Sequence, residues 1–225
     1  MRVRRTVDLS HPVDGNTQSY PGDPQPVFTP AATIAGTGFN LLHISLGSQS
    51  GTHVDAPYHF RADGATIDRL DLSLLTGTAV IVDLTHKGAR ERITRADLAP
   101  AAGKLDEEHI LVLHTGWDRH YGTCRYYDHP FLDAEACRHV LDAGVRTIAT
   151  DIINPDETVL DGPQPEGFPV HHLVAGAGGV IAENLTNLAA VDFPDPLLSL
   201  LPIKLTGADG APVRAVAMAA NPRRP

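Results

Sequence analysis

Short runs of β-branched and aliphatic residues recur along the whole chain, and this feature most limits what it can fold into. Each run has the length of one strand and is bounded by glycine, proline or small polar residues. The runs cover residues 3–9, 39–46, 79–85, 110–114, 145–152, 180–183, 203–206 and 213–218. Many short strands of this kind predict a fold built around a sheet.

Helical patterns are few. The clearest covers residues 133–143, where Asp133 can cap the helix and the apolar residues share one face before Gly144. A shorter helix is expected over residues 171–177, before a pair of glycines, and the proline-rich residues 11–30 predict an ordered loop. Together these patterns predict a mixed α/β fold, a strand-rich barrel-like sheet flanked by a few helices.

The bulk properties suggest one domain over residues 1–225 and exclude several partners. A chain of 225 residues suits a single barrel or sandwich. The net charge of −9 argues against binding to nucleic acid or to an anionic membrane. No apolar run reaches the roughly 18 residues of a membrane span, and the basic N-terminus lacks the apolar core of a secretory signal. We therefore expect a cytoplasmic protein.

The segment from Gln49 to His59, QSGTHVDAPYH, is the first candidate site. If it is extended, His53 and Asp55 point to the same side, because side chains alternate along a strand. An imidazole nitrogen and a carboxylate oxygen that converge in this way suit Zn²⁺ or Mn²⁺. Short motifs also occur as ordinary structural polar residues, so this pair does not define a site by itself.

A second candidate lies between His171 and Glu183. A helix that begins near His171, stops at Gly178-Gly179 and is followed by a strand ending at Glu183 would return the carboxylate to the start of the helix. Glu183 is equally consistent with a charge on an edge strand, and His171 with an ordinary residue of the first helical turn.

The residues from Gln49 to His59 resemble the HxGTHxDxPxH signature of the cyclase family, which includes bacterial kynurenine formamidases. The resemblance covers nearly the whole chain, and it implies the swivelling β/β/α fold of that family. The further similar segments follow in the family's order: DLSHP (8–12), YPGD (20–23), TGW (115–117), HP (129–130), residues 144–151, the block from His171 to Leu185, and GAPVR (210–214).

The resemblance also implies roles for single residues. It implies one or two divalent ions, Zn²⁺ or Mn²⁺, with Asp55 shared between the two positions. His59 would donate and accept a proton without being a required ligand, and Tyr20 stands where the family has a pocket tryptophan. Trp117 is a second candidate for the substrate pocket. The expected metal ligands are Gln49, His53, Asp55, His171 and Glu183.

The chain departs from the family at Gln49, where the signature begins with histidine. An amide oxygen binds zinc more weakly than imidazole does, so four outcomes are open. Either Gln49 ligates through its oxygen, or a metal such as Mn²⁺ is used, or only one metal is kept, or the site is inactive. His43, on a predicted strand, could fill the space of the missing imidazole. Asn154 and Tyr20 also differ from the family and affect the expected substrate more than the reaction.

The function implied is a metal-dependent, arylformamidase-like hydrolase. A water activated by the metal would attack the amide of a small carbonyl compound, and His59 would pass the proton to the leaving group. One alternative is a lactone or lactam hydrolase, or a biosynthetic cyclase or dehydratase, of the same family. Another is a non-catalytic small-molecule-binding protein with a degraded metal site. The resemblance further implies a homodimer or higher oligomer.

Overall fold

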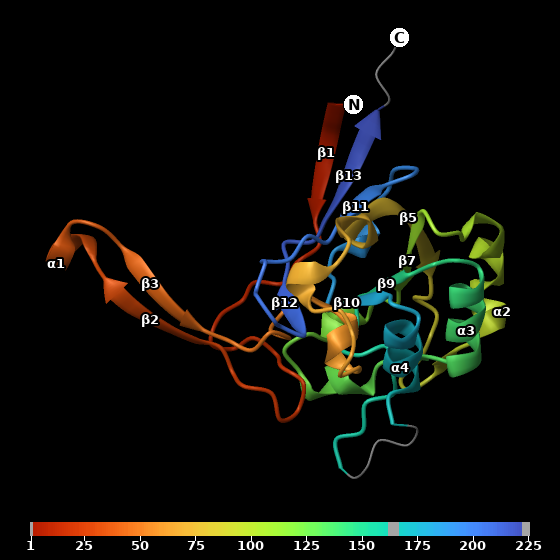
Figure 1. Cartoon of the computed structure of the whole chain (residues 1–225), viewed down its shortest axis with the longest axis horizontal. Helices are drawn as coiled ribbons and strands as arrows, with labels where there is room; N and C mark the ends of the chain where they lie inside the picture. The colour runs from red at the N-terminus through yellow and green to blue at the C-terminus, as the bar shows by residue number, and fades with distance from the viewer. Residues whose placement is uncertain (1, 162–166, 222–225) are drawn as a thin grey trace.

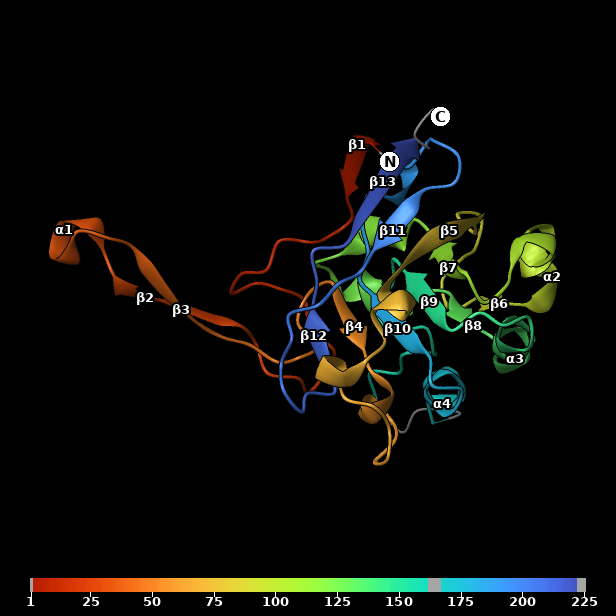
Figure 2. The same cartoon turned by 45° about the horizontal axis from the view of Figure 1, so that its top comes forward.

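A nine-stranded sheet forms the centre of the computed structural model, which describes residues 2–161 and 167–221. The middle strands β5, β7, β9 and β10 run parallel, and antiparallel strands extend the sheet on both sides. The sheet curls into a half-barrel (Figures 1 and 2). In spatial order the strands are β1 (Arg2–Asp8), β13 (Val216–Asn221), β11 (Leu197–Ser199), β5 (Thr76–Asp83), β7 (His109–His114), β9 (Thr147–Thr150), β10 (Val180–Glu183), β4 (His53–Asp55) and β12 (Gly210–Pro212).

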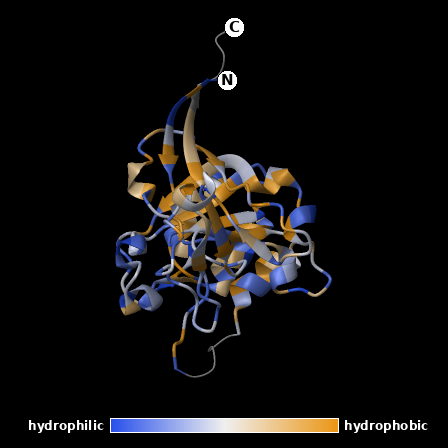
Figure 3. Ribbon diagram, turned by 90° about the vertical axis from the view of Figure 1, so that its left-hand side faces the viewer, coloured by the Kyte–Doolittle hydropathy of each residue, from blue (hydrophilic) through white to orange (hydrophobic). Residues whose placement is uncertain are grey.

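Both faces of the central strands are covered, which explains their continuous apolar runs. Along β7, Ile110 and Val112 pack into one hydrophobic cluster, and Leu111 and Leu113 pack into another on the opposite face. This is the alternation that a strand imposes on its side chains. Figure 3 shows apolar residues following these strands through the middle of the molecule. The predicted α/β fold with a strand-rich, barrel-like sheet is confirmed.

The α-helices of the body are short and cover one face of the sheet (Figure 1). α3 (Ala134–Asp142) begins as predicted at Asp133, whose side chain accepts a hydrogen bond from the Glu135 N–H. α4 (Pro169–Gly176) begins two residues before His171, because proline is favoured in the first helical turn. The other helical segments are α2 (Arg95–Leu98) and the 3₁₀ segments η1 (Pro57–His59), η2 (Ile67–Arg69), η3 (Leu72–Leu75), η4 (Ala99–Lys104), η5 (Trp117–His120), η6 (Cys124–Asp128) and η7 (Leu188–Ala190).

An arm projects from the body (Figures 1 and 2). It consists of β2 (Val27–Ala32), α1 (Ile34–Thr37) and β3 (Leu41–Ser45), with β2 and β3 paired antiparallel. The loop predicted over residues 11–30 therefore ends before Val27, and Pro30 is accommodated in a two-stranded ribbon whose strands are both edges. His43 lies exposed on this arm opposite Thr29, so it does not fill the space beside Gln49.

Some predicted elements differ from the structure. No strand covers residues 203–206; the preceding Pro202 forms only an isolated bridge with Val213, and the last strand begins at Val216. β6 (Arg92–Ile93) and β8 (Phe131–Leu132) form a separate parallel pair too short to show a sequence period. None of the helices in the described part of the chain is long and apolar enough to cross a membrane.

Candidate functional site

Three elements bring four titratable side chains together. On β4, His53 and Asp55 are two residues apart and therefore share a face. β10 pairs antiparallel with β4, and its last residue, Glu183, lies directly opposite His53. His171 enters from the first turn of α4. The chain returns from α4 to β10 through Gly179, where a Cβ would lie 2.4 Å from a backbone carbonyl oxygen.

Each carboxylate faces both imidazoles, with one oxygen toward each. His53 Nε2 lies 3.4 Å from Asp55 Oδ1 and 3.4 Å from Glu183 Oε2. His171 Nε2 lies 3.5 Å from Asp55 Oδ2 and 3.3 Å from Glu183 Oε1. All four residues are buried, with 3–5% of their surface exposed. We call these four residues the His-carboxylate cluster.

The donor set of this cluster fits a divalent metal. Both oxygens of Asp55 and Oε1 of Glu183 are buried without a hydrogen-bond partner, which is costly unless another group satisfies them. His53, Asp55 and Glu183 offer ligand atoms that all lie within 4.8 Å of one another. Zinc ligands at about 2.0–2.2 Å in a tetrahedron are separated by roughly 3.4 Å, close to the nitrogen–oxygen distances in the cluster.

The other ring nitrogen of each histidine is held by the protein, which leaves Nε2 for a metal. His53 Nδ1 lies 2.8 Å from the carbonyl oxygen of Gly51, and His171 Nδ1 lies 2.7 Å from Asp156 Oδ2. Asp156 also accepts the backbone N–H groups of Val170 and His171, so one carboxylate fixes both the start of α4 and the imidazole. Sequence reasoning did not identify Asp156 as this partner.

The backbone beside His53 is held just as firmly. Gly51 has φ +65°, and a Cβ there would come within 2.8 Å of Val13. Asn184, at φ +57°, donates from Nδ2 to the Gly51 carbonyl oxygen and accepts at Oδ1 from the Tyr126 hydroxyl. The hydroxyl of Thr52 donates to the Asn184 carbonyl oxygen at 2.6 Å. These bonds tie β4 to the end of β10 directly behind the cluster.

The electrostatics of the cluster favour positive charge. Burial lowers the pKa of His53, but Asp55 and Glu183 outweigh it and raise that pKa to about 10. Burial also opposes the charged form of His171, yet Asp156, Asp55 and Glu183 raise its pKa well above the ordinary value. Both shifts arise from the excess of negative charge that the carboxylates place around the two imidazoles. A divalent cation would offset this negative charge.

His59 and Gln49 lie at the edge of the cluster. His59, in η1, points Nδ1 at Asp209 Oδ2, 2.8 Å away, and its ring centroid is 6.1 Å from that of His171. Gln49 Nε2 donates to the same Asp209 oxygen at 2.9 Å. Gln49 Oε1 is buried and has no hydrogen-bond partner. Asp209 was not identified from the sequence.

A cavity of about 220 Å³ opens onto the cluster. Gln49, His53, His59, His171 and Glu183 contribute polar groups to its lining. The rest of its wall combines the aromatic and apolar side chains of Tyr20, Phe60, Ile153 and Phe168 with the polar residues Asp23, Asn154 and Asn184. The Phe168 ring lies 5.5 Å from Phe60 and 6.3 Å from Tyr20, measured between centroids. The cavity therefore suits a small molecule with a flat apolar part and a polar group beside the cluster.

Trp117 does not line this cavity, contrary to the expectation from sequence. Its side chain is buried with Tyr126 and Ile152, and the indole N–H donates to the Arg125 carbonyl oxygen. Asp151 accepts the backbone N–H groups of Thr115 and Gly116, and this fixes the turn that directs the indole into the interior.

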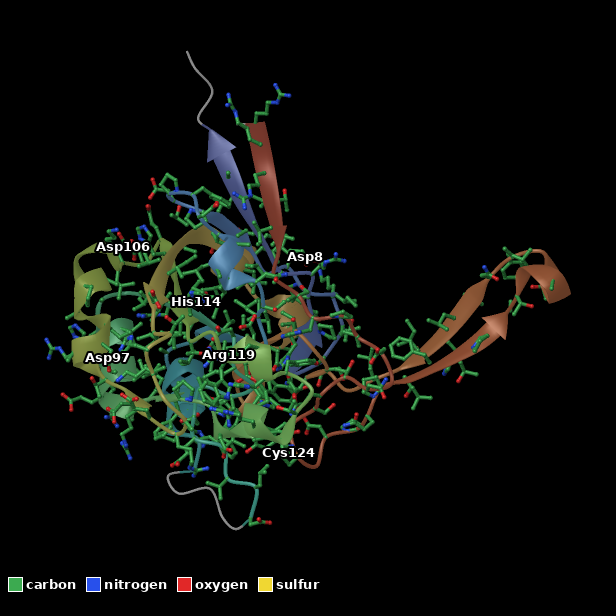
Figure 4. All side chains as sticks on the ribbon, turned by 180° about the vertical axis from the view of Figure 1, so that it is seen from behind. Asp8, Asp97, Asp106, His114, Arg119 and Cys124 are labelled. Atoms are coloured by element: carbon green, nitrogen blue, oxygen red, sulfur yellow. The ribbon has the colours of Figure 1, made fainter. Side chains whose placement is uncertain are left out.

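The cysteines are not placed for nucleophilic chemistry. Cys124 is exposed on the surface (Figure 4), and Cys137 is buried in α3. Burial raises the pKa of the Cys137 thiol to about 12, so the reactive thiolate is disfavoured.

Comparison with known proteins identifies the class of this fold and site. Residues 7–157 match the family model described as "Putative cyclase", and the chain belongs to the cyclase family. Kynurenine formamidase from Bacillus cytotoxicus is 31% identical over 218 residues, which is 96% of this chain and 98% of that protein. The Bacillus cereus kynurenine formamidase is 30% identical with the same coverage.

Solved structures show the same fold. Isatin hydrolase A from Labrenzia aggregata superposes with a TM-score of 0.86 at 22% identity, covering 96% of this chain and 94% of that one. A structure described as a potential metal-dependent hydrolase with cyclase activity has a TM-score of 0.76 at 27% identity, covering 97% and 99%.

Proposed function

We propose that this chain is a metal-dependent hydrolase that cleaves the carbon–nitrogen bond of a small, non-peptide amide. Membership of the cyclase family and the similarity to kynurenine formamidases support this class of reaction. The observation that supports it most is that both oxygens of Asp55 and Oε1 of Glu183 are buried without hydrogen-bond partners and face the Nε2 atoms of His53 and His171.

We propose that His53, Asp55, His171 and Glu183 hold the metal, with Gln49 as a weaker additional ligand. Imidazole and carboxylate suit Zn²⁺ best and Mn²⁺ next, and the two halves of the cluster suit one ion each. A bound divalent ion lowers the pKa of water and polarises a carbonyl oxygen. Burial of the four ligands excludes competing bulk water from them.

The remaining steps belong to His59 and the cavity wall. His59 accepts the proton of the attacking water and donates it to the leaving nitrogen, a role that contributes about 10²–10⁴-fold in rate. Tyr20, Phe60 and Phe168 bind the flat part of the substrate and keep its carbonyl beside the cluster. A formyl amide on an aromatic amine fits a cavity that has an apolar wall on one side and the His-carboxylate cluster on the other.

A lactam hydrolase is the second candidate, because a cyclic amide fused to an aromatic ring fits the same wall, and Tyr20 stands at a pocket position where the family has tryptophan. The test is to deplete the protein of metal, reload it with Zn²⁺ or Mn²⁺, and measure turnover of N-formylkynurenine and of isatin. Formamidase activity that returns with metal supports the first candidate, and activity on isatin alone supports the second. Metal binding without turnover of either would favour a binding protein.

We further propose a homodimer or higher oligomer that associates through the arm. Isolated two-stranded ribbons are marginally stable, and large exposed apolar patches mark interaction sites. The side chains of Ile34, Phe39, Leu41 and Ile44 are 50–65% exposed along the arm. Light scattering should give a multimer that Ile44→Asp dissociates, and a monomeric wild type would contradict the proposal. A cytoplasmic location stays a prediction from the sequence.

A further inference from the structure

The carboxylate of Asp209, in the turn before β12, contacts three side chains at the edge of the site. Ser48 Oγ donates to Oδ1 at 2.8 Å. Gln49 Nε2 donates to Oδ2 at 2.9 Å, and His59 Nδ1 lies 2.8 Å from the same oxygen. One carboxylate thus connects the residue that replaces a family histidine with the residue expected to carry the proton.

The carboxylate of Asp209 determines how the Gln49 amide and the His59 imidazole are oriented. Gln49 Nε2 and His59 Nδ1 are 3.3 Å apart, and each lies within hydrogen-bond distance of Asp209 Oδ2. An ionised carboxylate only accepts hydrogen bonds, so both nitrogens must direct a hydrogen at it.

For His59, this contact selects one neutral tautomer. With the hydrogen on Nδ1, the lone pair is on Nε2, the nitrogen that does not contact Asp209. His59 also lines the cavity, where a proton has to be accepted. A carboxylate that fixes the tautomer and orientation of a catalytic histidine is familiar from serine hydrolases.

For Gln49, the same contact fixes the carboxamide. With Nε2 held by Asp209, Oε1 is the atom left free, and it is buried without a hydrogen-bond partner. The amide packs against Gly210, where a Cβ would come within 2.7 Å of Nε2 and 2.8 Å of Oε1. Gly210 pairs with Asp55 across β12 and β4, so the free oxygen lies against the strand next to the one that carries His53 and Asp55.

We propose that Asp209 is a positioning residue that makes Gln49 a metal ligand through Oε1 and makes His59 a base through Nε2. This inference rests on the proposed function, because it assumes a divalent ion at the His-carboxylate cluster. It accounts for the Gln49 replacement: a neutral amide becomes a usable ligand when a neighbouring carboxylate prevents it from turning.

The test compares wild type with Asp209→Asn, Gln49→Ala and the double variant. Zn²⁺ affinity is measured by competition with a chromophoric chelator, and kcat for N-formylkynurenine is measured at saturating Zn²⁺. Asp209→Asn should weaken Zn²⁺ binding by about 10–100-fold, the range for residues that orient metal ligands. Gln49→Ala should weaken it similarly, and the double variant should be no weaker than Gln49→Ala. At saturating Zn²⁺, Asp209→Asn should still lower kcat by roughly 10²-fold or more, with a much smaller change in KM.

Ser48→Ala is the matched control, since it removes one hydrogen bond from the same carboxylate but leaves Oδ2 unchanged. Its Zn²⁺ affinity should stay within about threefold of wild type. Two results would overturn this inference but leave the proposed function intact. One is equal Zn²⁺ affinity in wild type and Asp209→Asn. The other is that Asp209→Asn lowers Zn²⁺ affinity as much in the Gln49→Ala background as in wild type. If Asp209→Asn does not fold, Gln49→Ala still decides, because unchanged affinity in that variant removes Gln49 as a ligand. A wild type that binds neither Zn²⁺ nor Mn²⁺ would overturn the proposed function as well.

Discussion

Glu183 lies directly opposite His53 across β10 and β4, and its Oε2 is 3.4 Å from the imidazole Nε2. The register of two short strands therefore brings together residues that are distant in the chain. Because His53 and Asp55 are two residues apart, the same register also brings Asp55 onto this face. The arrangement of the His-carboxylate cluster depends on strand pairing as much as on the identity of its residues.

Asp55→Ala should abolish both metal binding and activity. Asp55 directs one oxygen at each histidine, so its loss removes a ligand from both halves of the cluster. Metal content by elemental analysis and amide turnover measure the effect. Asp142→Ala, an exposed change at the end of α3, serves as the control and should match wild type. An Asp55→Ala variant that keeps its full metal content would refute the ligand assignment.

His59→Ala should lower kcat by roughly 10²–10⁴-fold while metal content is nearly unchanged. Its Nδ1 is held by Asp209, and its ring lies 6.1 Å from His171 between centroids, so it is placed to transfer a proton without being a ligand. Steady-state kinetics and elemental analysis on one preparation separate the two effects. Loss of metal in parallel with activity would make His59 a ligand.

Gln49→His should raise Zn²⁺ affinity at the first metal position, because imidazole binds zinc better than an amide oxygen does. Activity need not rise, since the variant loses the hydrogen bond that Gln49 donates to Asp209 in the wild type. Wild type and variant are prepared with the same zinc supply and compared by stoichiometry and chelator competition. No gain in either quantity would mean that Gln49 does not weaken the site.

His129 should make the fold sensitive to acid. Burial lowers the pKa of its imidazole to about 4, and its two nitrogens lie 2.8 Å from the Pro130 carbonyl oxygen and from the Thr158 hydroxyl. The unfolded chain takes up a proton near pH 6.5, before the folded protein does, so stability is lost as pH falls from about 6.5 to about 4. The loss reaches about 2 kcal/mol at about pH 5.

Urea unfolding at about pH 7 and pH 5 measures this contribution. His129→Gln keeps a polar side chain without a titratable group, so the difference in unfolding free energy between the two pH values should shrink by about 2 kcal/mol. An identical pH dependence in wild type and variant would show that folding does not lower the pKa of His129.

The parts of the fold that are marked by local pattern could be predicted from the sequence. Strand β7 is recognisable because both of its faces are buried, and α3 because Asp133 caps an apolar face. β11 and β12 have three residues each, too few for a period to appear. In the arm, β3 lies within the strand predicted over residues 39–46, whereas β2 escaped prediction because its residues are mostly exposed and it contains proline.

In the candidate site, too, only the residues marked by a local pattern could be predicted from the sequence. His53 and Asp55 are adjacent in the pattern of one strand, so their convergence can be argued from alternation alone. Asp209 lies 150 residues from His59 and Asp156 lies 15 from His171, and no local period marks either carboxylate as a partner. Trp117 was expected in the cavity, but Asp151, 35 residues from Gly116, fixes the turn that buries it. Such long-range hydrogen bonds become visible only in the folded chain.

An anomalous-scattering map of crystals of the zinc-loaded protein tests the central claim most directly. We predict a peak about 2.0–2.1 Å from His53 Nε2, between Asp55 and Glu183, and a second peak at the same distance from His171 Nε2. Zinc occupancy at the position beside His53 should depend on Gln49. Zinc bound elsewhere, with no peak among His53, Asp55, His171 and Glu183, would contradict the account.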